Sequence, residues 1–172
     1  MILGMSLPTF TLVHVVLSLV GIFAGLVVLF GMFGSRNAKG WTALFLATTV
    51  LTSVTGFFFP VDRILPSHIV GIISLVVLAI ALVALYGKSL DGHWRWIYIV
   101  SAALALYLNV FVAVAQSFLK FPALKSLAPT QSEPPFLVAQ VIVLALFVVL
   151  GFFALRSFHP RTDTLASNAV LH

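Results

Sequence analysis

The chain contains no cysteine, which excludes disulfides, thiol redox chemistry, iron–sulfur clusters and thiolate metal sites. Charge is scarce as well, since only 8% of the 172 residues are charged and four of those are acidic. An ordinary soluble domain carries about 25% charged residues. With 62% hydrophobic residues and a mean hydropathy of +1.20, the sequence predicts an integral membrane protein.

Several classes of function are disfavoured by what is missing. The net charge of +5 does not indicate nucleic-acid binding, because the basic residues are scattered between apolar runs and form no patch. The sequence contains no Gly-x-Ser-x-Gly motif of the kind used in nucleophilic hydrolysis. A bound metal ion would need three or four ligands. His14, His68 and Glu133 would supply three only if the loop carrying Glu133 folded inward. We therefore expect no metal and a non-catalytic or accessory role.

Five apolar segments are long enough to cross a bilayer, whose core of about 30 Å takes about 20 helical residues. They are residues 7–33, 41–60, 65–87, 94–118 and 135–158. The first is expected to be retained, because no basic region or cleavage site accompanies it. The sequence thus predicts an all-α, polytopic five-helix membrane bundle forming one domain, residues 1–160, followed by a polar tail, residues 161–172.

The basic residues predict an orientation. Six lie on one side of the five segments and three on the other, and the richer side is expected in the cytoplasm. The six are Arg36, Lys39, Lys88, Arg95, Arg156 and Arg161, and the three are Arg63, Lys120 and Lys125. The N-terminus is then outside, and the C-terminus with its tail is cytoplasmic.

Polar side chains are concentrated in the outer half of the predicted spans. At 1.5 Å per residue, His68 lies about 3 Å below the outer end of its span, Gln140 and Thr55 about 7 Å, and His14, Asn109 and Thr52 about 10 to 12 Å. The inner half offers no polar route, which argues against a channel or transporter. We predict an outward-facing pocket for a lipid-like or quinone-like ligand, lined by His14, Thr52, Thr55, His68, Asn109, Gln116, Glu133 and Gln140.

Three other interpretations remain open. The threonines, Asn109 and Gln140 also suit hydrogen bonding between neighbouring helices. His14 and His68 could hold a b-type haem, which would make the protein an electron carrier, although their depths differ by about 7 Å. A structural subunit of a homo-oligomer or larger membrane complex is the third interpretation.

The segment from Lys120 to Pro135 connects the last two spans on the outer side. Its four prolines predict a semi-rigid cover over the pocket rather than a loose linker. Glu133 in this segment can pair with a neighbouring cation or face a ligand. The alternative is an ordinary connection whose prolines only begin the last helix.

Four stretches resemble small uncharacterised bacterial inner-membrane proteins. They cover most of the second to fifth spans and read GWTALFLATTVLTSVTGFFFP, SHIVGIISLVVLAIALVALYG, LNVFVAVAQSF and LAPTQSEPPF. The resemblance implies a location in the bacterial inner membrane and implies no activity.

Overall fold

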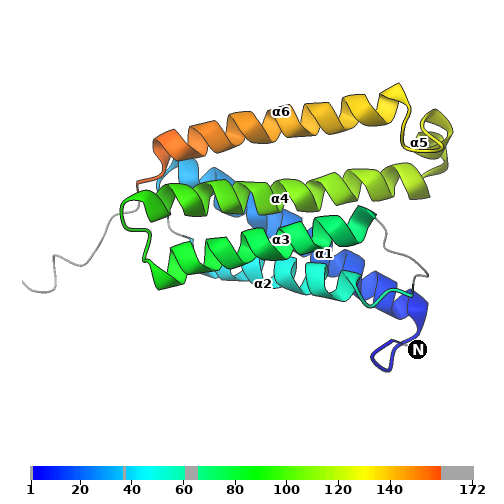
Figure 1. The fold of residues 1–172 in the computed structure, drawn as a ribbon, viewed down its shortest axis with the longest axis horizontal. Helices are drawn as coiled ribbons and strands as arrows, with labels where there is room; N and C mark the ends of the chain where they lie inside the picture. Colours follow the sequence, from blue (N-terminus) through cyan, green and yellow to red (C-terminus); the bar gives the residue numbers. More distant parts are fainter. Residues whose placement is uncertain (1, 37, 61–65, 160–172) are drawn as a thin grey trace, which may run out of the picture.

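The computed structural model describes residues 2–36, 38–60 and 66–159, and this part of the chain is all-helical, as predicted (Figure 1). The elements are α1 (Leu7–Phe33), α2 (Lys39–Gly56), α3 (Pro66–Leu82), the π-helical turn η1 (Val83–Gly87), α4 (His93–Lys120), α5 (Pro122–Leu127) and α6 (Pro134–Ser157). Two of the basic residues used for the orientation, Arg63 and Arg161, lie outside the described residues, as does the predicted tail.

Four helical stretches of the described chain are long and apolar enough to cross a membrane: Leu7–Phe33, Ser67–Gly87, His93–Lys120 and Pro134–Ser157. They indicate a multi-pass membrane protein. The second predicted span is not among them, because α2 has 18 residues and includes Lys39 and several threonines.

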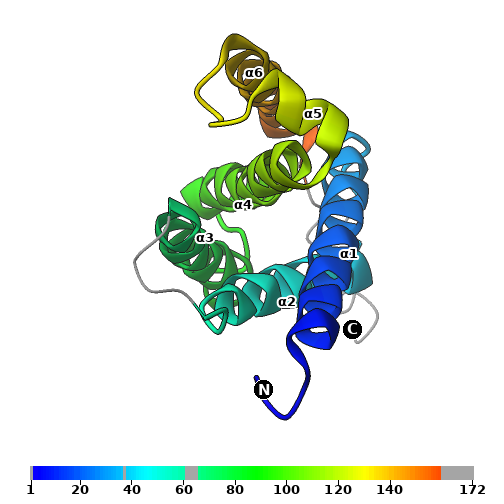
Figure 2. The same cartoon turned by 90° about the vertical axis from the view of Figure 1, so that its right-hand side faces the viewer.

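The helices run alternately up and down. Viewed along the bundle, α1, α2, α3 and α4 follow one another around a ring, and α6 packs outside it against α4 and α1 (Figure 2). The end at which α1, α3 and α6 begin we call the proline-rich end, because Pro8, Pro66 and Pro134 stand at these helix starts. The opposite end, where α2 and α4 begin, we call the basic end.

The apolar core fills the ring toward the basic end. It includes Ala24, Val28, Phe45 and Leu106 from three helices. Gly25 lets these helices approach closely, because a Cβ atom there would lie 2.6 Å from Leu106 Cδ1 and 2.8 Å from the ring of Phe45.

Helix ends follow local chemistry, with some differences from the predicted bounds. The Ser6 hydroxyl accepts a hydrogen bond from the Thr9 amide and caps α1, which covers residues 7–33 as expected. Helix α2 ends at Gly56 rather than at residue 60, where the Phe57 and Phe58 amides donate to the Val54 and Thr55 carbonyl oxygens at 3.1 Å and tighten the last turn. Helix α6 ends at Ser157, and Phe158 is extended.

Candidate functional site

His14 lies in the contact between α1 and α2, toward the proline-rich end. Its Nδ1 atom is 2.8 Å from Thr55 Oγ1, and its ring packs edge-on against Phe59 at 5.2 Å between centroids. The Thr55 hydroxyl donates to the Leu51 carbonyl oxygen at 2.7 Å. The two predicted residues therefore lie together, in a hydrogen bond whose donor depends on the histidine tautomer.

Asn109 reaches across the ring from α4 to α2. Its Nδ2 atom donates to Thr49 Oγ1 at 3.4 Å, and both side chains are buried. Gly21 of α1 faces the same point, since a Cβ atom there would lie 3.2 Å from Thr49 Oγ1 and 3.3 Å from Asn109 Nδ2. Three helices thus meet around one polar contact.

Thr52 is buried between these two contacts on the same face of α2. Its hydroxyl has no hydrogen-bond partner among the described residues. Thr48, one turn away, satisfies its own hydroxyl by donating to the Leu44 carbonyl oxygen at 2.7 Å. We call His14, Thr49, Thr52, Thr55 and Asn109 the polar layer.

Gln140 belongs to a different contact, between α6 and α4. Its Nε2 atom donates to the Phe111 carbonyl oxygen at 3.1 Å, while Oε1 is buried without a described partner. Gln131, in the loop before α6, donates from Nε2 to the Ala115 carbonyl oxygen at 2.6 Å, one turn further along α4 than Phe111. Two glutamine amides therefore fasten the last helix and its preceding loop to α4.

His68 lies on α3, which contributes no residue to the polar layer, and Gln116 lies on α4, seven residues after Asn109. His68, at the start of α3, packs against the ring of Phe57 at 5.6 Å, whereas His14 contacts Thr55 and Phe59. His14 is on α1 and His68 is on α3, and α2 packs against both of these helices (Figure 2). Gln116 is exposed on α4.

The segment from Lys120 to Pro135 is folded, and its helix α5 packs on α4. The Glu133 carboxylate accepts hydrogen bonds within its own loop, from the Thr130 hydroxyl at 2.9 Å and the Ser132 amide at 3.0 Å. Desolvation would raise the pKa of Glu133, but these hydrogen bonds outweigh it and hold the pKa below its ordinary value. The described contacts of this carboxylate are thus internal to the loop.

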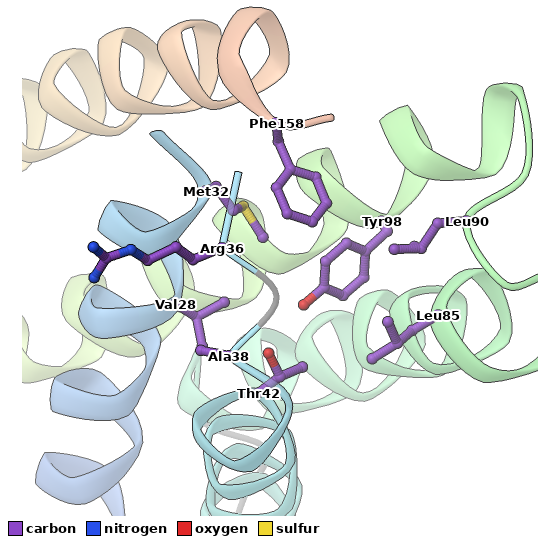
Figure 3. Close-up of a pocket in the computed structure, with 9 residues that line it drawn as sticks. All are labelled: Val28, Met32, Arg36, Ala38, Thr42, Leu85, Leu90, Tyr98 and Phe158. Carbon is purple, nitrogen blue, oxygen red and sulfur yellow. The ribbon is translucent and has the colours of Figure 1, made fainter. Parts of the chain in front are cut away.

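A cavity of about 10 Å³ lies at the basic end, which is about the size of one water molecule. Tyr98, Thr42 and Phe158 line it, and the Tyr98 hydroxyl points toward Thr42 (Figure 3). Phe158 is 2% exposed although it follows the end of α6. The Arg95 guanidinium donates to its carbonyl oxygen at 2.6 Å and fixes this segment to α4.

Sequence reasoning missed Thr49, Gln131 and Phe158. Thr49 was missed because the sequence does not fix how α2 is rotated about its axis. Gln131 was missed because its contact with α4 depends on a backbone φ of 60°. Among the described residues, no group of three His, Cys, Asp or Glu side chains is placed to hold a metal ion.

Comparison of the chain with protein-family models, with curated proteins and with solved structures finds no match in any of the three.

Proposed function

We propose that the polar layer binds the oxygen-bearing head group of a membrane amphiphile, lipid-like or quinone-like, in a non-catalytic role. The observation that supports this most directly is the hydroxyl of Thr52, which is buried without a described partner. A buried polar group left without a partner costs about 1 to 3 kcal/mol. A carbonyl or hydroxyl oxygen of a ligand would remove that cost.

The surroundings of Thr52 suit such a ligand. His14 and Asn109 add hydrogen-bonding groups one turn to either side, and the core beyond them is apolar. Phe59 covers His14 from a segment outside any helix, so a movement of its ring would open the layer toward the proline-rich end.

We further propose that α2 also crosses the membrane, giving five spans, with the N-terminus outside and the C-terminus in the cytoplasm of a bacterium. Its 18 residues span about 27 Å, close to the thickness of a bilayer core. Reporter fusions to both termini test the orientation, and a C-terminal reporter active outside the cell would refute it.

The ligand proposal is tested on protein purified in a mild detergent, by organic extraction and mass spectrometry. We expect a bound lipid or quinone, retained roughly three- to tenfold less by Thr52→Val because one hydrogen bond is lost. Thr48→Val is the matched control, because its hydroxyl is satisfied within its own helix. Equal retention by both variants would refute the proposal.

The visible spectrum of the same sample separates the alternatives. A Soret band that disappears in His14→Ala would identify haem and overturn the amphiphile proposal. Colourless protein without bound lipid or quinone would leave a structural subunit of a larger complex.

A further inference from the structure

Five basic side chains gather at the basic end, opposite the polar layer. Arg36, Lys39, Lys88 and Arg156 are exposed, and Arg95 is half-buried. The carboxylate described at this end is Asp91, and no ion pair is found among the described residues for any of the five cations. Their charge is therefore not neutralised by this part of the chain.

Contacts between the helix ends bring these residues to one surface. The Ser35 hydroxyl donates to the Ser157 carbonyl oxygen at 2.7 Å, which joins the end of α1 to the end of α6. Arg95 joins the start of α4 to the same segment. Figure 3 shows the Arg36 guanidinium directed away from the cavity that these ends surround.

Aromatic side chains of the kind that lie at the level of membrane head groups are found on this surface. Trp41, Tyr86 and Trp96 are exposed there, as in the aromatic belts of membrane proteins. Lys88 lies over the ring of Trp94 at 5.5 Å, and the Arg156 guanidinium lies over Phe152 at 4.4 Å. Lys88 and Arg156 thus stand directly beside aromatic rings.

We propose that the basic end binds the anionic head groups of phospholipids and so prefers an anionic leaflet. The partner is a lipid rather than a soluble polyanion, because exposed aromatic rings flank the cations. This inference is independent of the ligand proposed for the polar layer, which lies toward the other end.

The test compares lipid binding by matched charge variants of the full chain. Native mass spectrometry would count bound phosphatidylglycerol and phosphatidylcholine after reconstitution in an equal mixture of the two. A basic residue near an anionic surface contributes a factor of about five. Lys39→Gln with Lys88→Gln should therefore reduce the preference for phosphatidylglycerol by up to about 25-fold. The control is Lys120→Gln with Lys125→Gln, which removes two exposed lysines from the other end.

Equal preference in wild type and the first variant, or an equal loss in the control, would overturn the proposal. The wild type gives a second measurement that needs no substitution. Its preference for phosphatidylglycerol should fall as sodium chloride is raised from about 50 to about 500 mM, because the screening length then shortens from roughly 14 Å to roughly 4 Å. A preference unchanged by salt would contradict an electrostatic origin. Displacement of the bound lipid by about 10 mM inorganic phosphate, too dilute to act by screening alone, would reassign the site to free anions.

Discussion

Gly25 offers the sharpest test of the packing between α1, α2 and α4. In Gly25→Ala the added methyl group would lie 2.6 Å from Leu106 Cδ1 and 2.8 Å from two ring atoms of Phe45. Both neighbours are 1% exposed, so neither has free space to move into. Overpacking of this kind costs about 1 to 3 kcal/mol, against about 1 kcal/mol gained in helix propensity. We expect a net loss of up to about 2 kcal/mol.

Gly31→Ala on the same helix is the matched control. Its nearest neighbour would be the Arg36 carbonyl oxygen at 3.8 Å, an ordinary contact, so this variant should gain up to about 1 kcal/mol. Unfolding by SDS, followed by circular dichroism in detergent, measures both variants. The reasoning is refuted if Gly25→Ala is at least as stable as Gly31→Ala.

Three further predictions concern the polar contacts and the two ends. Asn109→Leu removes the donor to Thr49 and should lower the free energy of unfolding by about 1 kcal/mol, measured by the same SDS titration; an unchanged value would contradict the bond. Phe158→Ala should cost about 3 kcal/mol, whereas Phe153→Ala, at 53% exposure, should cost far less, and equal effects would contradict burial of Phe158. Because the folded-state pKa of Glu133 lies below its unfolded value of 4.5, its stabilisation of the loop is present at neutral pH and is lost as pH falls through the folded pKa. Hydrogen-exchange protection in this loop should fall on acidification in the wild type and stay constant in Glu133→Gln.

Hydropathy and helix-ending residues were enough to predict an all-helical membrane protein, because the thickness of the bilayer sets the length of an apolar segment that crosses it as a helix. The partners of the polar side chains were harder to predict. Thr49 and Thr52 are three residues apart on one face of α2, and a small rotation of the helix decides which of them meets Asn109. The Lys120 to Pro135 segment is held by hydrogen bonds within the loop and by the bond from Gln131 to the Ala115 carbonyl oxygen, and no periodicity reveals either. Whether the polar layer binds a ligand stays a prediction.

The separation of the two ends bears on what the protein can do. Between Thr42 and Thr48, about 9 Å of α2 presents Phe45 and Leu46 to the core, where Gly25 and Leu106 close the space around them. An ion crossing this layer would have to leave its hydration in an apolar interior, which is strongly unfavourable. A head group bound at the polar layer would therefore stay at its own end. The described packing thus disfavours the passage of an ion between the two ends, and binding at either end stays a proposal.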